Sequence, residues 1–416
     1  TLSGANTYTG TTTINAGDLT VSGSLHDSTA VTIASGADYN VNASDTVASI
    51  EGAGNIVIAS SQTLTAGDGN DKTLSGVISG AGNYIKAGSG TQTLSASNTY
   101  TGTTQVSAGT LTVSGSGRLS DSTAVTVDSG AVYNVAVSDT VASIAGAGSI
   151  TLGSNTLTSG GSDASTTFSG VISGTNGNII KAGTGTLTLT GNNSYTGSTT
   201  ISAGLLKIIR DDPTSYLAAT SGFTGPGNLT IESSGDDFTA DIVTGTHVQL
   251  AGTALGNLII GKTGNTRQID LSSDITTTGT QTYNGPVRLV GGDRTVSTTN
   301  SNVIFASTVN SDGTQRALTV TNGTGDTTFS GAIGGSAPVK SLTITSDQLT
   351  AGAITLNGAL TATLGGSSSI TGVIANGAST ANLVKAGSGT LTLSGANTYT
   401  GTTTINAGDL TVSGSL

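Results

Sequence analysis

The chain has 416 residues, of which 63 are glycine, 9% are charged, 3% are aromatic and none is cysteine, methionine or tryptophan. Glycine is about twice as frequent as in ordinary globular proteins, and charged residues are far rarer. A net charge of -11 leaves no cationic surface for nucleic acid. With two histidines and no cysteine, we expect no His/Cys zinc site and no cofactor. The 34% hydrophobic content argues against disorder.

No apolar run reaches the roughly 18 residues of a membrane-spanning helix. The chain begins inside a repeated pattern, with TLSGANTYTG. We therefore expect any targeting or anchoring segment to lie outside this sequence.

The chain opens with a sequence that recurs later. The opening TLSGANTYTGTTTINAGDLTVSGS returns with changes at Thr93 and Thr188, and a last copy starts at Thr392, so that the copies are spaced 92, 95 and 204 residues apart. Residues 1–25 are identical to residues 392–416, whereas the copies at Thr1 and Thr93 differ at seven of 25 positions. We infer two levels of duplication and a tandem unit of 391 residues.

The repeats predict a division into consecutive segments of one continuous solenoid. These are a first repeat unit at 1–92, a second at 93–187, a longer and more diverged unit at 188–391, and the start of the next unit at 392–416. Within the third, residues 207–280 form a non-repetitive insertion, and residues 281–340 follow as a different repeat type.

Apolar residues alternate with Thr, Ser or Asn over four to six positions, as in DLTVSG, AVTIAS, NIVIAS and TLTLTG. This period predicts short strands, and the glycines that follow every 7 to 10 residues mark corners. Helix is expected to be negligible. A sandwich of antiparallel strands and a parallel β-solenoid are both open, and repeats at two scales favour the solenoid. At about 22 residues a coil it has roughly 19 coils, with small aliphatic residues filling a core too narrow for aromatic rings.

A recurring succession of short motifs resembles the repeat of a known protein family. The succession K-A-G-x-G-T, L-x-L, N-x-Y-T-G and T-x-I-x-A-G-x-L occurs three times in full and once as its opening half. It resembles the passenger-associated repeat of Gram-negative autotransporters and related giant type V secreted adhesins. The segment QTYNGPVRLVGGDRTVSTTNSNVIFASTVNSDG from Gln281 is more loosely similar to repeats of haemagglutinin-like exoproteins.

The resemblance implies a right-handed parallel β-helix, export across the outer membrane, and a place on the surface of a Gram-negative bacterium or outside it. It does not separate the autotransporter route from two-partner secretion. It also implies a protein of cell adhesion, with matrix or biofilm roles among those of the family.

Four sets of residues recur at fixed places in the repeats. We expect the tyrosines of N-x-Y-T-G to cover corners of the coils with solvated hydroxyls, with a sugar-stacking platform as the alternative. The asparagines should satisfy backbone groups of turns. The lysines of K-A-G-x-G-T should lie over the coil surface with solvated ammonium groups, a ligand contact being the alternative. The repeat positions are Asn6, Tyr8, Gly10, Lys86, Asn98, Tyr100, Gly102, Lys181, Asn193, Tyr195, Gly197, Lys385, Asn397, Tyr399 and Gly401.

Other polar residues are candidates for calcium binding or catalysis. Asp68 and Asp71 in AGDGNDKTL are weak calcium candidates, because stacked copies of such a loop are needed and there is one. Neighbouring acids, Asp211 with Asp212 and Asp236 with Asp237, would point to opposite faces of a strand and so make no acid/base couple. Neither His26 nor His247 stands in a nucleophile motif. We expect no catalytic site.

Threonine triplets suggest one more binding class, because flat ranks of threonine match ice. The triplets noted are Thr110 to Thr112, Thr186 to Thr190 and Thr390 to Thr392, about one per 80 to 200 residues. An ice-binding face needs them in consecutive coils.

We therefore predict a non-catalytic stalk or filament segment of a giant secreted adhesin. Its partners would be neighbouring repeat units of the same chain, with lateral or end-to-end self-association and surface glycans or matrix as further partners. The alternative is a glycan- or receptor-binding module that uses a lateral loop formed by residues 207–280.

Overall fold

The computed structural model describes residues 1–213, 222–250 and 255–416. The chain divides into two compact units, one of residues 1–205 and the other of the described residues from 206 onward. Every described strand pair is parallel, and the described residues contain no helix, so none that could span a membrane. Each unit is a parallel β-solenoid, which confirms the predicted fold class, and the coils total about 19.

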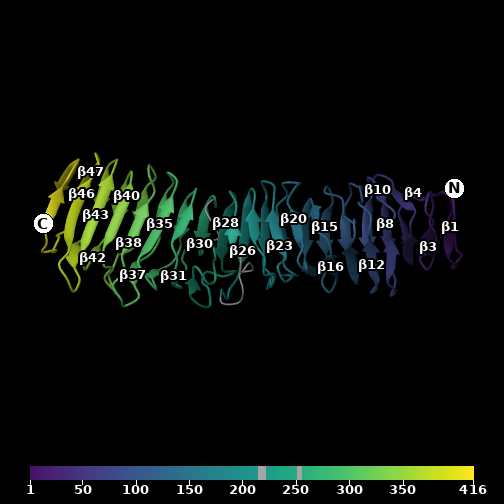
Figure 1. Ribbon diagram of the computed structural model, residues 1–416, viewed down its shortest axis with the longest axis horizontal. Helices are drawn as coiled ribbons and strands as arrows, with labels where there is room; N and C mark the ends of the chain where they lie inside the picture. Colours follow the sequence, from purple (N-terminus) through teal and green to yellow (C-terminus); the bar gives the residue numbers. More distant parts are fainter. Residues whose placement is uncertain (214–221, 251–254) are drawn as a thin grey trace. The chain divides into compact units, whose positions relative to one another are not determined.

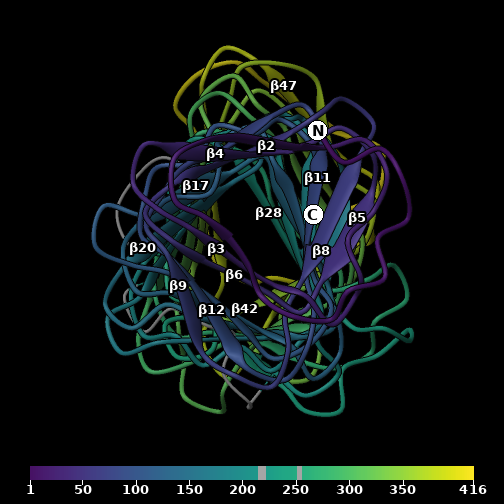
Figure 2. The same cartoon turned by 90° about the vertical axis from the view of Figure 1, so that its right-hand side faces the viewer.

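In the first unit the strands form three walls, each built from one strand of successive coils (Figures 1 and 2). The first wall consists of β1 (Thr12–Ile14), β3 (Ala30–Ile33), β6 (Ser49–Gly52), β9 (Lys72–Leu74), β12 (Thr91–Leu94), β14 (Thr110–Val113), β16 (Val132–Val135), β19 (Ser149–Thr151) and β22 (Val171–Ser173). The second consists of β2 (Gly17–Val21), β4 (Ala37–Val41), β7 (Asn55–Ile58) and β10 (Ile78–Gly80), then β17 (Asp139–Val141), β20 (Thr156–Ser159), β23 (Asn178–Lys181) and β25 (Thr199–Ile201). The third consists of β5 (Asp45–Val47), β8 (Thr63–Ala66), β11 (Asn83–Lys86), β13 (Thr104–Val106), β15 (Ala124–Val127), β18 (Ser143–Gly146), β21 (Thr166–Phe168) and β24 (Thr186–Leu189).

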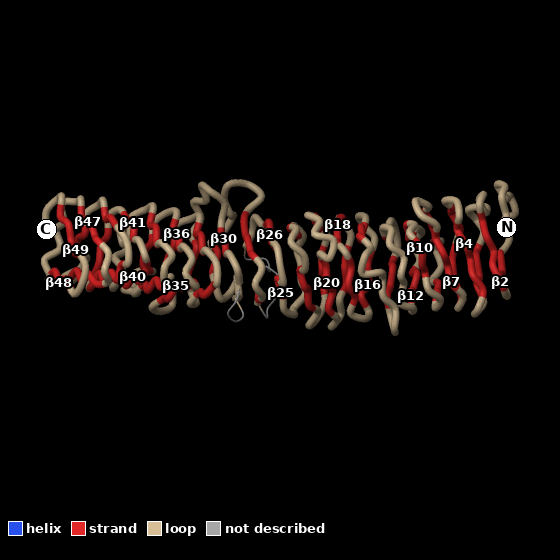
Figure 3. The backbone as a smooth tube through the Cα atoms, turned by 90° about the horizontal axis from the view of Figure 1, so that it is seen from above, coloured by secondary structure: helices blue, strands red, loops and turns tan. Residues whose placement is uncertain are grey.

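The second unit has the same construction, and its strands also lie side by side along each wall (Figure 3). It begins with β26 (Leu205–Ile209) and β27 (Phe223–Thr224). One wall consists of β28 (Asn228–Glu232), β30 (Leu258–Ile260), β33 (Gln281–Tyr283), β36 (Val303–Phe305), β39 (Thr327–Phe329), β41 (Leu349–Ala351), β44 (Ser368–Ile370), β47 (Thr390–Leu393) and β49 (Asp409–Val412). Another consists of β29 (Ile242–Val243), β31 (Ile269–Leu271), β34 (Val287–Leu289), β37 (Val309–Ser311), β42 (Ile354–Leu356) and β45 (Ile374–Asn376). The last consists of β32 (Ile275–Thr277), β35 (Arg294–Thr298), β38 (Leu318–Thr321), β40 (Leu342–Ser346), β43 (Ala359–Leu364), β46 (Asn382–Ala386) and β48 (Thr403–Ile405).

The alternation read from the sequence sets which side of each strand is buried. In β24, Leu187 and Leu189 are buried, and Thr186 and Thr188, which alternate with them, are partly exposed. The described residues of the segment 207–280 also form strands that pair with neighbouring coils, such as Leu229 with Leu258. These strands belong to the coil stack. The remaining residues of that segment, 214–221 and 251–254, lie outside the described part of the chain.

The core contains aromatic rings, so the prediction of a core too narrow for them was wrong. Tyr39, Tyr84, Tyr133 and other tyrosines are fully buried. In the second unit, Tyr283, Phe305 and Phe329 stack in three successive coils, with ring centroids 5.1 and 4.8 Å apart. Parallel in-register strands hold such rings at a spacing close to the 4.8 Å between strands, so aromatic side chains fit when they recur in one column.

Candidate functional site

The copies of the repeat occupy different walls of the first unit. The T-x-I strand that follows N-x-Y-T-G is β1 in the first copy, β13 in the second and β25 in the third, and these three strands belong to three different walls. The reason is arithmetic: partners on successive coils are about 20 residues apart, as Thr12 and Val31 are, and spacings of 92 and 95 residues are not whole multiples of a coil. Within this unit, the repeats therefore do not line up as a column on one face.

The repeated lysines are buried. Lys86 is 1% exposed, and its Nζ donates hydrogen bonds to the carbonyl oxygens of Ala87 (2.6 Å), Gly88 (2.9 Å) and Ala108 (3.1 Å), the last in the next coil. Burial lowers the pKa of this ammonium. The other two lysines make the same three bonds and are buried as well: Lys181 to Ala182, Gly183 and Ala203, and Lys385 to Ala386, Gly387 and Ala407.

This corrects the expectation of solvated ammonium groups. Lysine is seldom buried without partners, and here backbone carbonyls of two coils supply all three acceptors that an ammonium group needs. With its donors taken up in this way, the group ties two coils together, and no donor remains for a ligand.

The repeated tyrosines are buried too. Tyr100 is fully buried and its hydroxyl bonds to Thr104 Oγ1, and Tyr195 makes the same bond to Thr199 at 2.6 Å. Burial raises the pKa of Tyr195 to about 12. The prediction of solvated hydroxyls was wrong for these copies, and their rings are inaccessible as a sugar-stacking platform. Tyr399 is 9% exposed, and only Tyr8, in the first copy, is exposed, at 41%.

Two of the repeated asparagines, Asn98 and Asn397, bond to the coils on both sides. Asn98 Oδ1 accepts from the backbone N of Ile78 (2.9 Å) in the preceding coil, while Nδ2 donates to Ala96 O (3.0 Å) and to Arg118 O (2.7 Å) in the following coil. These bonds satisfy backbone groups where the second wall lacks a regular strand. The equivalents are Asn397, which bonds to Ile374, Gly395 and Ser415, and Asn193, which accepts from Ile172.

The glycine of the same motif stands against the preceding coil. A Cβ atom on Gly102 would lie 2.2 Å from the carbonyl oxygen of Gly82, and one on Gly197 would lie 2.3 Å from that of Gly177. Gly401 is in the same position against Ala381. Gly10 has no atom within 4 Å of such a Cβ. The motif thus needs glycine wherever another coil precedes it.

Two buried tyrosine–aspartate pairs were missed by the sequence analysis. Tyr39 donates to Asp45 at 2.7 Å, and Tyr133 donates to Asp139 in the corresponding place of the second repeat unit. Desolvation by burial raises the pKa of both carboxyl groups. The signal was present in the sequence, because Y-N-V-x-x-S-D-T-V occurs in both units. Each carboxylate also accepts a backbone hydrogen bond from the preceding coil, from Leu25 and Leu119.

The two calcium candidates, Asp68 and Asp71, accept hydrogen bonds from backbone N–H groups of their own turn and of the next coil. Asp68 accepts from the backbone N of Asn70 (2.7 Å), and Asp71 accepts from that of Thr91 (2.7 Å). Across the described residues, no three His, Asp or Glu side chains gather as a metal site would require. Nothing further supports calcium at Asp68 and Asp71.

The candidate catalytic residues also make hydrogen bonds to residues in turns. Asp211 accepts from Ser234, and Asp237 accepts from Thr266, in each case across a coil boundary. His26 Nδ1 accepts from the backbone N of Ser28, and His247 Nδ1 accepts from that of Val243.

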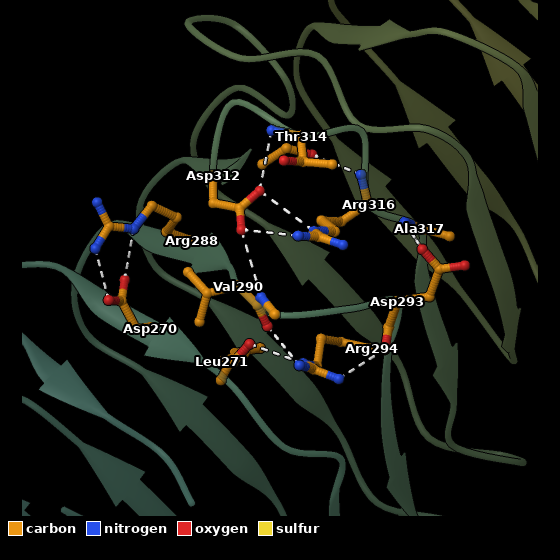
Figure 4. A network of polar contacts seen from close by, with 12 residues as sticks. Asp270, Leu271, Arg288, Val290, Asp293, Arg294, Asp312, Thr314, Arg316 and Ala317 are labelled. Carbon is orange, nitrogen blue, oxygen red and sulfur yellow. Dashed lines mark hydrogen bonds and ion pairs between the residues drawn. The ribbon is translucent and has the colours of Figure 1, made fainter. Parts of the chain in front are cut away.

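A polar network crosses three successive coils of the second unit (Figure 4). Arg288 makes two hydrogen bonds to Asp270 on the neighbouring strand, at 2.8 and 2.6 Å, and Arg316 bonds to Asp312 at 3.3 Å through each of two nitrogens. Arg294 donates to the backbone oxygens of Leu271, Val290 and Asp293. Charge is scarce in this chain, and here it links one coil to the next.

A regular threonine face lies on the outer side of β38, β40 and β43. Thr319, Thr343 and Thr361 are register partners in three consecutive coils, and so are Thr321, Thr345 and Thr363. The expectation that threonine triplets do not recur in consecutive coils was wrong. In the sequence, LTVT, LTIT and LTAT indicate only alternating strands, and the shared face follows from their register.

One shallow groove of about 340 Å³ lies at a corner of three coils in the second unit. Its lining is uncharged and consists of Thr263, Gly264, Asn265, Thr266, Asn284, Gly285, Pro286, Ala306 and Ser307. Asn265 is buried, and its amide is held by the backbone of Arg267. Ligand pockets commonly have about 300–1,000 Å³, so the groove has room for a small ligand.

Comparison with known proteins identifies the repeat. The profile of the passenger-associated-transport-repeat matches residues 1–21, 85–113, 179–208 and 383–412, and the three later matches include the buried Lys86, Lys181 and Lys385. The chain thus carries this repeat four times, as the resemblance indicated. The looser similarity of residues 281–340 to haemagglutinin-like repeats stays a prediction, as do the repeat-unit boundaries.

A curated relative is the adhesin BmaC autotransporter of Brucella suis biovar 1 (strain 1330), which is 34% identical over 146 residues. The alignment covers 32% of this chain and 4% of that protein, so the chain spans a small part of its relative's length. No solved structure matches the chain significantly.

Proposed function

We propose that this chain is a non-catalytic structural segment of a secreted or surface-displayed passenger protein of a Gram-negative bacterium, and that it serves as a stalk. The passenger repeat and the autotransporter adhesin relative support the passenger assignment. A stalk needs coils that hold to one another, and it needs no ligand.

The proposal rests on where the hydrogen-bond partners of the repeated polar residues lie. Lysine, tyrosine and asparagine of each full repeat make their hydrogen bonds inside the protein, and lysine and asparagine of the second repeat each bond to a neighbouring coil as well. Within the first unit, copies of the repeat face three different walls. A multivalent binding surface would display its repeated residues outward and on one face.

The mechanism is mechanical. Hydrogen bonds between coils run along the stacking direction, and each coil contacts its two neighbours, so stability is close to a sum of nearest-neighbour terms. Under tension, coils should detach in several steps. Pulling the chain by its termini in a force spectrometer checks this: stepwise release at substantial force is expected, and extension at negligible force contradicts a stalk.

The alternative is an adhesive module, and the groove at residues 263–307 favours it as a specific feature. Its uncharged hydroxyl and amide groups suit a neutral sugar, and part of it belongs to the segment 207–280. An array of glycans and matrix proteins separates the two proposals, because a stalk should bind none of them. Ligand capture that Ser307→Trp abolishes, while Thr324→Trp in a neighbouring exposed turn does not, would favour adhesion.

A further inference from the structure

Two neighbouring coils of the second unit carry the same three residues, Asn-Gly-Ala. Residues 357–359 join β42 to β43 (Figure 1), and residues 376–378 run from the end of β45 into the corner that follows it. Leu356 and Asn376 are register partners, so the second copy lies in the coil after the first. Because the local sequences are identical, a difference in reactivity between Asn357 and Asn376 must come from the fold.

Asparagine followed by glycine can modify itself. The backbone nitrogen of the glycine attacks Cγ of the asparagine, and glycine has no side chain to obstruct the approach. The bond from this nitrogen to Cγ forms, the bond from Cγ to Nδ2 breaks, and ammonia leaves with the proton of the backbone N–H. The product is a five-membered succinimide ring, which water opens to aspartate or to isoaspartate.

The side-chain carbonyl of Asn357 is polarised by the next coil. Its Oδ1 accepts hydrogen bonds from the backbone N–H of Ala378 at 2.5 Å and from that of Ser379 at 3.1 Å. Two N–H donors stabilise the negative charge that Oδ1 acquires when Cγ is attacked, as in the oxyanion hole of an acyl-transfer enzyme. Asn357 is partly exposed, so water can reach the ring and open it.

The attacking and leaving groups at this corner are both free. Within the described part of the chain, neither the backbone N–H of Gly358 nor Nδ2 of Asn357 donates a hydrogen bond. Loss of the proton from the Gly358 nitrogen therefore breaks no bond to the protein, and neither does the release of ammonia. Gly358 is partly exposed, so solvent can take up the proton.

Asn376 has the same polarised carbonyl without the two free groups. Its Oδ1 accepts from the backbone N–H of Ala381 at 2.8 Å and from that of Thr400 at 3.2 Å. The N–H of Gly377, however, donates to Leu356 O at 2.6 Å, and Asn376 Nδ2 donates to Thr400 Oγ1 at 2.8 Å. The attacking nitrogen is thus held between two coils, and it becomes reactive only when the corner opens.

The sequence has three more Asn-Gly pairs, and none of them has two donors on the asparagine oxygen. Among the described contacts, Oδ1 of Asn176 and Oδ1 of Asn284 accept no hydrogen bond. Oδ1 of Asn322 accepts one, from Thr327 at 3.4 Å, and this asparagine is fully buried. Asn357 therefore combines a polarised carbonyl with a free attacking nitrogen in a way that these three do not.

We propose that Asn357 is a site of spontaneous modification, at which the corner converts its own asparagine to aspartate and isoaspartate while Asn376 stays intact in the folded chain. The reaction consumes only water and occurs once per chain. Isoaspartate carries the backbone through Cγ and so adds one carbon atom to the corner. That corner has little room, because a Cβ on Gly358 would lie 2.8 Å from the carbonyl oxygen of Lys340 in the preceding coil. We expect the lengthened corner to loosen this contact between coils.

One tryptic peptide reports on both asparagines. No lysine or arginine lies between Lys340 and Lys385, so trypsin releases residues 341–385 together. The folded full chain is incubated in mildly alkaline buffer made with water that carries a heavy oxygen isotope, and it is then unfolded and digested in ordinary water. The heavy oxygen marks rings that opened during the incubation. Electron-transfer fragmentation of the peptide locates each modification and distinguishes isoaspartate from aspartate.

In the folded chain, Asn357 is expected to react at least about ten-fold faster than Asn376, whose nitrogen needs an opening of the corner. The matched control is the same chain unfolded in urea, where the two Asn-Gly-Ala sequences should react at closely similar rates. Asn357 should react in the folded chain at least as fast as in urea. Equal rates for the two asparagines in the folded chain overturn the proposal, and so does a rate for Asn357 that folding lowers. The inference is independent of the proposed stalk, which involves no covalent chemistry.

Discussion

At the scale of the residue, the chain uses its few charges inside the coil stack. Lys86 has three carbonyl partners from two coils, and Arg294 likewise donates to three backbone oxygens. Hydrogen bonds to a charged group contribute about 1.5–3 kcal/mol each, more than bonds between neutral groups. In a protein built of short strands and corners, such groups fix the corners where regular pairing stops.

Replacing Lys86 by methionine should therefore destabilise the first unit by about 2 kcal/mol or more, because the change keeps the apolar stem and removes all three bonds. Urea unfolding followed by circular dichroism measures this. The matched control is Lys72→Met, which removes a partly exposed ion pair to Glu51 at 3.0 Å and should cost less than about 1 kcal/mol. Equal losses for the two variants would contradict the assigned role.

The buried aspartates predict a dependence on pH. Burial raises the pKa of Asp139, so the folded chain holds a proton where the unfolded chain has lost it. Its contribution to stability is then greatest in acid and falls as pH rises from about 4 through the raised pKa. Relative to the unmodified chain, Asp139→Asn should gain stability as pH increases from about 4 toward 7, as measured by urea midpoints.

Asp293 provides a control of opposite sign. A hydrogen bond from the backbone N of Ala317, assisted by Lys340, lowers the pKa of this carboxyl group. Its contribution is present above a pH of about 4 and is lost as pH falls. Asp293→Asn should therefore lose stability relative to the unmodified chain as pH rises, whereas Asp139→Asn should gain it. The same slope in both variants would refute the assignment.

At the scale of the element, the period-two patterns predicted strands well, and they failed to predict what fills the corners. TLTL at 186–189 is a strand with buried leucines, as alternation indicates. Lys86 and Tyr100 were placed at the surface because lysine is seldom buried and tyrosine usually reaches water. Lys86 has a carbonyl partner in the next coil, and Tyr100 has the hydroxyl of Thr104 four residues further along the chain. Sequence patterns do not show which coil lies alongside or that these partners are within reach.

The motif glycine gives an element-scale prediction with an internal control. Gly102→Ala should place a methyl group 2.2 Å from the Gly82 carbonyl oxygen, which forces two coils apart. A loss of about 1–3 kcal/mol is expected, as for overpacking in a core. Gly10→Ala, at the same motif position with open space, should change stability by less than about 0.5 kcal/mol. Thermal unfolding of the two variants makes the comparison, and a harmless Gly102→Ala would be inconsistent with the close approach.

At the scale of the whole molecule, the sequence predicted coils but not the wall on which each repeat lies. That placement follows from the sum of coil lengths between copies. Partners are 19 residues apart between Thr12 and Val31, and 24 apart between Phe305 and Phe329. An error of a few residues in the assumed length of each coil adds up over 92 residues. It then places a repeat on the wrong wall. The placement of the T-x-I strand on a different wall in each copy, as β1, β13 and β25, could therefore be known only from the structure.

Nearest-neighbour stability makes a prediction for the entire chain. A coil with one covering neighbour opens more easily than one with two, because opening breaks half as many interfaces. In a polypeptide made of residues 1–416 alone, amide hydrogens of residues 1–25 and 392–416 should therefore exchange faster than those of residues 93–117, although the sequences are closely similar. The two terminal segments give identical peptides, so mass spectrometry reads them together, and both are half-covered. Equal protection of the terminal and central segments would show that coil stability resides in the local sequence and not in the neighbours, and the additive account of the stack would fail with it.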